Sequence, residues 1–495
     1  MDERERDPIR KSSPTTESER FVAELCEGTF LRLWSYPCVY QDKGVSQTGE
    51  GKELCDLLVV FENHILIFSD KHCVFPSTGN SELDWSRWYR RSVLAAEKQL
   101  RGAERWIKDH PDRIFVDRGC KQRFPVSIPS FADAKYHLLV VAHGSVQRTR
   151  QALGGTGGLV VTNMLAEDDL LKKPFTAGEL CPTKTFVHIF DDASFPIVLR
   201  SLDTITDFVD YLAAKEELLR SPIPLLARSE EDLLATYLPN VGPFGQRVFA
   251  VELTSEGIQI DEGQWQQLEA SGWWKHEQEL NELSYAWDSM IEASATNTLD
   301  DRRWVAYPHD SFSDSELILR FMAREGRVRR RTLGRMWLEG LTKSTPTDTY
   351  TRYLVPRDAD ETCWIFLFVP RLASMTYEEY RERRAAILET ECRLLKHRHP
   401  SATDIIGIAG EAGFNHVDRS EDLMYFNARI WSAEDAQTAG ELHRKRRPVE
   451  SQVIFPAEYN ERPPEFLQTL VRKVSDGPCP CGSGEIYAQC PCRTA

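Results

Sequence analysis

The first apolar pattern along the chain predicts a helix followed by a β-hairpin. Apolar residues recur at helical spacing over residues 17–34. Two continuous apolar runs follow at residues 57–61 and 65–68, separated by Glu62, Asn63 and His64. Short apolar runs that flank a polar turn indicate a hairpin whose two faces are both buried.

Longer elements follow this hairpin. A helix is predicted over 81–107, buried strands over 136–142 and 185–190, and a helix over 202–219. We interpret His137 and His143, on or just past the first of these strands, as core residues. The order of helix, hairpin, helix and strand predicts a mixed α/β domain over residues 17–228, preceded by a polar, disordered leader over 1–16.

The second half of the chain has three predicted parts. Residues 229–345 are rich in tryptophan and charge, and their pattern predicts a mostly helical region. An α/β pattern returns over 346–443, with strands at 351–355, 364–369 and 404–409 and a helix over 377–396. The charged, proline-bearing stretch 444–478 is predicted to be a linker.

Composition and charge restrict the possible functions. Net charge is −15 over 495 residues, so nucleic acid could be held only by local basic patches or through bound metal ions. The acidity also disfavours adsorption to an anionic membrane, and we find no run of eighteen apolar residues. The N-terminus lacks the apolar segment of a signal peptide. These features, and eight cysteines scattered singly, predict a cytoplasmic protein.

The remaining four cysteines lie close together in the last seventeen residues. They form two Cys-Pro-Cys groups, Cys479 with Cys481 and Cys490 with Cys492. So short a segment cannot bury enough apolar surface to fold alone. Four thiolates suit tetrahedral Zn²⁺, whose binding supplies folding free energy. The alternatives are two disulfides or four free thiols, and disulfides are rare in the cytoplasm.

This tail resembles the SEC-C motif, which occurs at the end of many bacterial proteins. Cys479, Cys481, the Gly482-Ser483-Gly484 turn, Tyr487 and Cys490 all match it. Pro491 departs from it, because the motif's last two ligands are adjacent; Cys492 is therefore displaced by one residue. The resemblance implies a structural zinc module over residues 479–495 that docks a protein partner.

The hairpin ends carry the second candidate site. Asp56 begins its first strand, and Asp70 and Lys71 end its second. A three-residue turn would place Asp56 opposite Asp70, whereas a two-residue turn would place Asp56 facing Ser69 or Lys71. Clustered carboxylates bind Mg²⁺, and a neighbouring ammonium can orient a water. Such a set of groups suits phosphodiester hydrolysis.

Here the chain resembles the PD-(D/E)xK nuclease superfamily, whose restriction-endonuclease-like core has this order of elements. The resemblance assigns the strand-start acid to Asp56 and the tripeptide lysine to Lys71. It implies a Mg²⁺ or Mn²⁺ cofactor and a nucleic-acid substrate. Glu27 or Glu24, on the first helix, would supply a further acid. Gln99, midway along the helix over 81–107, matches a polar residue of some members.

One residue departs from this nuclease pattern. Ser69 stands two positions before Lys71, where the superfamily has an acid. Asp70 could compensate if the strand end bulges, or Glu53 could take its place. The leading hypothesis is therefore a metal-dependent nuclease that uses Glu27, Asp56, Asp70 and Lys71. The alternative is a non-enzymatic zinc-binding interaction protein with an inactive nuclease-like scaffold.

A basic stretch in the predicted helical region offers a last candidate. Arg327, Arg331 and Arg335 are spaced along one face of a predicted helix, with Arg329 and Arg330 beside them. They could grip phosphates, or they could pair with nearby acids on a solvated face.

Overall fold

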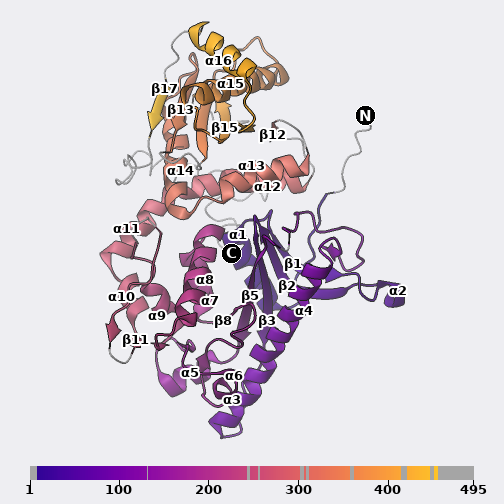
Figure 1. Ribbon diagram of the computed structural model, residues 1–495, viewed down its shortest axis with the longest axis vertical. Helices are drawn as coiled ribbons and strands as arrows, with labels where there is room; N and C mark the ends of the chain where they lie inside the picture. The colour runs from indigo at the N-terminus through magenta and orange to yellow at the C-terminus, as the bar shows by residue number, and fades with distance from the viewer. Residues whose placement is uncertain are drawn as a thin grey trace. The chain divides into compact units, whose positions relative to one another are not determined.

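The computed structural model describes residues 8–130, 132–241, 246–254, 257–300, 306–307, 311–356, 362–413, 421–445 and 451–454. The chain divides into two compact units, with the boundary between Glu277 and Gln278. Both units are mixed α/β, as predicted. We call them the N-terminal unit and the C-terminal unit and describe each by itself (Figure 1).

The boundary between the units differs from the predicted domain ends at 228 and 345. Residues after 228 stay in the N-terminal unit because β11 (Gly257–Ile260) pairs in parallel with β9 (Leu225–Ala227). Ile258 and Ile260 join the same buried cluster as Leu225 and Val161. The predicted helical region 229–345 is therefore shared between the two units.

A six-stranded mixed sheet forms the centre of the N-terminal unit. Its strand order is β4-β1-β2-β3-β5-β8. The first four strands of this order run antiparallel to their neighbours, while β5 is parallel to β3 and β8 is parallel to β5. The strands are β1 (Ser35–Gln41), β2 (Lys52–Phe61), β3 (His64–His72), β4 (Ile114–Phe115), β5 (Lys135–His143) and β8 (Val187–Asp191).

Helices cover both faces of this sheet. Figure 1 shows α4 on one side of the strands and α7 and α8 on the other. Phe30 of α1 packs against Phe68 of β3 and Phe208 of α8, so α1 lies on the face of α7 and α8. The helices are α1 (Glu17–Phe30), α3 (Ser81–Tyr89), a π-helical turn (Arg90–Leu94), α4 (Ala95–Asp109), α7 (Ser194–Ser201) and α8 (Ile205–Arg220).

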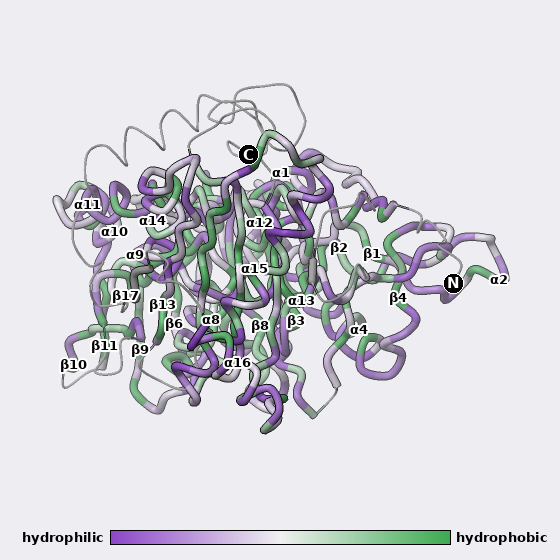
Figure 2. Tube along the Cα trace, turned by 90° about the horizontal axis from the view of Figure 1, so that it is seen from above, coloured by the Kyte–Doolittle hydropathy of each residue, from purple (hydrophilic) through white to green (hydrophobic). Residues whose placement is uncertain are grey.

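Burial on both faces explains the apolar strand pattern. Val59 and Val60 of β2 and Ile65 and Leu66 of β3 are fully buried, although successive residues face opposite sides. The strands of this sheet are largely hydrophobic in Figure 2. The predicted hairpin is therefore confirmed, and its turn has two residues, because Phe61 pairs with His64.

Smaller elements complete the N-terminal unit. A five-stranded sheet has the order β10-β11-β9-β6-β7. Its remaining strands are β6 (Val160–Thr162), β7 (Thr176–Ala177) and β10 (Leu253–Thr254). The short helices are α2 (Val45–Thr48), α5 (Val146–Leu153), α6 (Glu167–Leu170), α9 (Glu230–Ala235), α10 (Gln264–Glu269) and α11 (Gly272–Asn281), the last of which contains the unit boundary.

The C-terminal unit also has a six-stranded mixed sheet, with the order β12-β16-β15-β14-β13-β17. Every residue of its central strand β14 is buried. The strands are β12 (Ala306–Tyr307), β13 (Tyr350–Leu354), β14 (Cys363–Val369), β15 (Asp404–Glu411), β16 (Asp422–Asn427) and β17 (Ser451–Ile454). The helices are a 3₁₀ turn (Glu282–Ser284), α12 (Tyr285–Leu299), α13 (Phe312–Ala323), α14 (Arg327–Lys343), α15 (Tyr377–Arg398) and α16 (Ala433–Lys445).

Part of the predicted linker belongs to this second sheet. β17 lies within residues 444–478 and pairs in parallel with β13, from Thr351 opposite Ser451 to Leu354 opposite Ile454. Its sequence is only four residues long, and its neighbour in the sheet lies about a hundred residues earlier, so local pattern alone does not indicate it. Within the described ranges, we find no helix long and apolar enough to cross a bilayer.

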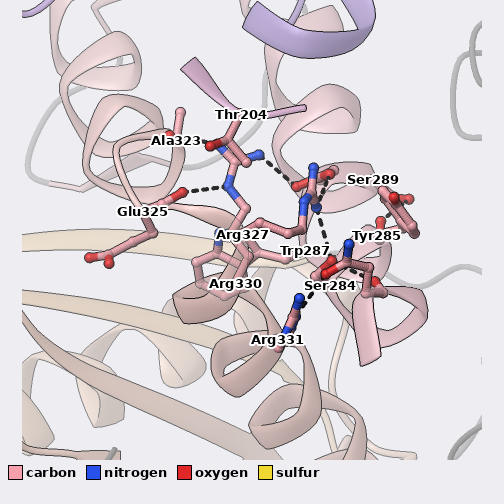
Figure 3. A network of polar contacts seen from close by, with 12 residues as sticks. Thr204, Ser284, Tyr285, Trp287, Ser289, Ala323, Glu325, Arg327, Arg330 and Arg331 are labelled. Atoms are coloured by element: carbon pink, nitrogen blue, oxygen red, sulfur yellow. Dashed lines mark hydrogen bonds and ion pairs between the residues drawn. The ribbon is translucent and has the colours of Figure 1, made fainter. Parts of the chain in front are cut away.

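The arginines of α14 are engaged in ion pairs within the C-terminal unit (Figure 3). Arg327 and Arg330 each donate to Asp288 of α12 over 2.7 Å. Arg335 pairs with Glu339 at 2.8 Å. Arg330 is fully buried and also donates to the carbonyl oxygens of Ala323 and Glu325. The prediction of pairing with acids is thus confirmed, but the paired face is buried at Arg327 and Arg330 and not solvated.

Candidate functional site

The middle of β2 and the end of β3 bring Asp56, Asp70 and Lys71 together, so Asp56 does not begin its strand as predicted. Continuing the hairpin ladder beyond Leu57 opposite Phe68 places Asp56 opposite Ser69. The three-residue turn considered above is therefore wrong, and the two-residue alternative describes the register. Because successive side chains of a strand face opposite sides, Ser69 and Lys71 share the face of Asp56.

Asp56 is enclosed by donors on the α4 face of the sheet. Its Oδ2 accepts the backbone N–H of Asp70 at 2.6 Å and lies 3.5 Å from Nζ of Lys71. Its Oδ1 accepts the side-chain amide of Gln99 at 3.2 Å, and Ser69 donates to the other end of that amide at 3.1 Å. The side chain of Asp56 is 9% exposed and that of Lys71 is 26% exposed.

The carboxylate of Asp70 points to the opposite face. It accepts a hydrogen bond from the hydroxyl of Ser18 in α1, and its Oδ1 lies 2.6 Å from Nε2 of His143. Its side chain is 3% exposed. Asp56 and Asp70 are therefore close through the backbone, but their carboxylates do not converge. The prediction that both would share one metal ion does not match this geometry.

Glu27 lies outside this cluster. Its carboxylate pairs with Lys11 at 3.2 Å and Arg32 at 3.5 Å. Ser18, the α1 residue that touches Asp70, lies nine positions earlier, which is about 13 Å along a helix. Residues near the start of α1, and not Glu27, therefore reach the sheet end. Sequence periodicity placed Glu27 on the right helix but could not say which turn approaches the strands.

The electrostatics follow from burial and from these partners. Burial raises the pKa of Asp56, although Lys71, the N–H of Asp70 and Gln99 oppose the shift. Burial lowers the pKa of His143, but its hydrogen bond to Asp70 and the charge of that carboxylate outweigh burial, so the net shift is upward. His143 therefore binds a proton more readily than an ordinary histidine does.

His143 is the site residue whose role the sequence did not disclose. It ends β5, which runs parallel to β3, and it pairs with His72 in the ladder, beside Asp70. Gly144 follows with φ of 98°, and a Cβ there would collide with the carbonyl oxygen of Cys73. The chain can therefore turn away directly after His143. Parallel pairing of distant strands was the missing information, because no local pattern shows it.

In the described part of the chain, no group of three or more His, Cys, Asp or Glu side chains is arranged to hold a metal ion. Asp56 supplies one carboxylate, and the position expected for a second is Ser69. The predicted zinc ligands Cys479, Cys481, Cys490 and Cys492 lie outside the described residues.

Comparison with known proteins adds no family to this description. No family model matches the chain, and no curated protein or solved structure matches it.

Proposed function

We propose that this chain is a non-enzymatic interaction protein whose N-terminal unit serves as a nuclease-like scaffold. The observation that carries the proposal is the division of the acids between two sheet faces. Asp56 is held by Gln99, Lys71 and a backbone N–H, while Asp70 is held by Ser18 and His143. A hydrolytic Mg²⁺ site needs several hard oxygen ligands around one point. Here each carboxylate is surrounded by hydrogen-bond donors of the protein, and the two carboxylates do not face a common point.

The nuclease-like architecture rests on the order of elements. Apart from the short elements α2 and β4, the chain from α1 to β5 forms a helix, three antiparallel strands, a long helical segment and a parallel strand. The resemblance to the PD-(D/E)xK superfamily assigns Asp56 to a strand start and Lys71 to the next strand; both lie on the paired strands β2 and β3, although Asp56 is the fifth residue of β2. Fold alone does not define activity, and Ser69 replaces the acid on which that chemistry depends.

Retained cleavage is the competing function, and one observation favours it. Burial raises the pKa of Glu53, and the negative charges of Asp56 and Glu19 raise it further, so these acids are close enough to interact. A divalent ion would relieve that repulsion. Glu53 would then act as the second carboxylate, with Lys71 beside the attacking water.

A nuclease assay on the full chain separates the two functions. We expect no cleavage of single- or double-stranded DNA or RNA with Mg²⁺ or Mn²⁺ beyond that of a Lys71→Ala preparation purified in parallel. Cleavage that Lys71→Ala and Glu53→Gln both abolish would overturn the scaffold proposal.

Stability provides an independent test of the same proposal. Asp56→Ala should lower the free energy of unfolding by about 1–3 kcal/mol, because the N–H of Asp70 and the amide of Gln99 lose their acceptor. Asp56→Asn keeps an acceptor oxygen and should cost less. Urea denaturation of both variants measures this. An Asp56→Ala protein as stable as the parent would argue against a structural role.

For the C-terminal tail, we propose a zinc module that docks a protein partner. Cys479→Ser and Cys481→Ser should each release close to one zinc ion per chain, because three ligands hold Zn²⁺ far more weakly than four. Elemental analysis of dialysed protein measures the metal. The matched control is Cys73→Ser, a single, partly exposed cysteine of the N-terminal unit. If elemental analysis finds no zinc in the parent protein, the tail proposal is wrong.

A further inference from the structure

An open groove of about 650 Å³ lies beside the C-terminal half of α4. Its other wall is the segment Thr183–Thr185, which leads into β8. Two hydrogen bonds join the walls: Arg101 Nη1 donates to the carbonyl oxygen of Thr185 at 2.6 Å, and the hydroxyl of Thr185 donates to Glu104 at 2.5 Å. The groove therefore has fixed sides within one unit.

Basic side chains outnumber acids in this groove. Its charged residues are Arg101, Glu104, Arg105, Lys108, Asp109 and Lys184. Glu104 is buried and is already neutralised, because Lys108 donates to it at 2.6 Å. Arg105 and Lys184 are exposed, and within the described ranges neither side chain has an ion pair or a side-chain hydrogen bond. The two walls thus each present a cation whose charge is not offset by a direct partner.

Two further observations describe the polar groups around the groove. Arg101 uses Nε on Glu97 and Nη1 on Thr185, but its buried Nη2 has no hydrogen-bond partner in the described part of the protein. The pKa of Cys181 lies below its ordinary value: hydrogen bonds with Thr183 lower it most, and the charges of Lys184 and Arg101 add to the effect. The positive charges of Arg101 and Lys184 thus act on a neighbouring side chain as well, although the whole chain carries a charge of −15.

We propose that this groove binds phosphate groups, either those of a single-stranded nucleic-acid backbone or those of a free nucleotide. Arginine presents a planar fork of donors that matches phosphate oxygens, and lysine adds a mobile point charge. Arg105 on one wall and Lys184 on the other would contact adjacent phosphates, and the hydroxyl of Thr183 would add a neutral donor. Contacts to phosphate groups carry no sequence information, so this type of binding would not select a sequence.

This groove is separate from the Asp56 cluster, so the inference goes beyond the scaffold proposal. Gln99, which touches Asp56, and Arg105 are six residues apart on α4, or about 9 Å along the helix. Binding at the groove requires no metal ion and no cleavage. The assay can therefore be run without divalent cations, where neither outcome depends on nuclease activity.

Fluorescence anisotropy of a labelled single-stranded DNA of about twenty nucleotides tests the proposal on the full chain. We expect binding at low salt, with log K falling against log salt with a slope of about −1.4 to −2, as for two or three phosphates. Unlabelled pyrophosphate should compete. If pyrophosphate binds and DNA does not, the phosphate belongs to a small ligand. If neither binds, the proposal is overturned.

Charge variants locate the binding. Arg105→Glu combined with Lys184→Glu should weaken binding at least tenfold, whereas Asp109→Asn should strengthen it about twofold by removing the remaining free acid of the groove. Lys173→Glu is the matched control, because this exposed lysine belongs to the same unit but does not line the groove. Unchanged binding in the double variant, with an unchanged melting temperature, would exclude the groove as the site.

Discussion

Asp288→Ala should destabilise the C-terminal unit by about 3–5 kcal/mol, the cost of leaving a buried charge without its partner. Asp288 accepts from Arg327 and Arg330 at once, both over 2.7 Å, and both arginines are buried. Burial opposes ionisation of Asp288, yet the two guanidinium charges and their hydrogen bonds lower its pKa below the ordinary value. Hydrogen exchange of the α12 and α14 amides, with urea denaturation of the full chain, measures the loss in this unit.

Two companion variants separate charge from packing at this position. Asp288→Asn keeps an acceptor of nearly the same shape, so it should cost less than Asp288→Ala. Adding Arg327→Met to Asp288→Ala removes one of the two buried cations that have lost their carboxylate partner. The double variant should therefore recover part of the lost free energy of unfolding. If Asp288→Ala costs under 1 kcal/mol, or if Arg327→Met adds a further loss, the buried triad is not what stabilises these helices.

The same triad shows why sequence patterns predicted the helix but not its role. Arginines at spacings of three and four indicated one face of α14, and helical spacing is a local property. Whether that face meets water depends on Asp288, which lies about forty residues earlier on another helix. Local sequence carries no information about that pairing. The basic face was therefore equally compatible with phosphate binding and with buried ion pairs.

At the candidate site, too, the sequence predicted the local elements but not which way the side chains face. The apolar runs around Glu62 and Asn63 predicted the hairpin, and hairpin geometry correctly brought Asp56, Asp70 and Lys71 close together. The strands are buried on both faces, so no alternation of apolar and polar residues indicated which side each acid faces. One residue of register then decided whether the two carboxylates would share a face.

Strand β1 was missed for a different reason. Residues Ser35–Gln41 include Pro37 and two tyrosines and lack a continuous apolar run. Pairing with β2 on one side and β4 on the other nevertheless buries most of this strand. Here tertiary pairing overrides weak local propensity.

The second large effect that we expect is a loss of stability of the N-terminal unit at low pH, caused by two histidines, His64 and His137. Nδ1 of His64 lies 2.9 Å from Nε2 of His137, an arrangement in which one ring donates and the other accepts. Burial lowers the pKa of His137 to about 3 and that of His64 to about 4, with nearby Lys135 contributing to both. The folded state therefore holds both rings neutral near pH 7.

The direction of the effect follows from linkage. The unfolded chain binds protons below a pKa of about 6.5, whereas folded His137 resists protonation until about pH 3. Its contribution to stability is thus complete above pH 6.5 and is lost as the pH falls. Between pH 7 and 4.5, the His137→Phe variant should gain about 2–3 kcal/mol in free energy of unfolding relative to the parent.

His143→Phe is the matched control, because its ring is also largely buried but its pKa is raised. That contribution is complete below the unfolded pKa and is lost as the pH rises through the folded pKa, so this variant should be penalised more at pH 5 than at pH 8. Comparing each variant with the parent cancels the effects of carboxyl groups that titrate over the same range, such as Asp210 with a pKa raised to about 6. Urea denaturation at several pH values gives both differences. If the stability difference from the parent changes with pH in the same direction for both variants, burial does not set the protonation of His137, and pairing with Asp70 does not set that of His143. The pKa directions given above for these two histidines would then be wrong.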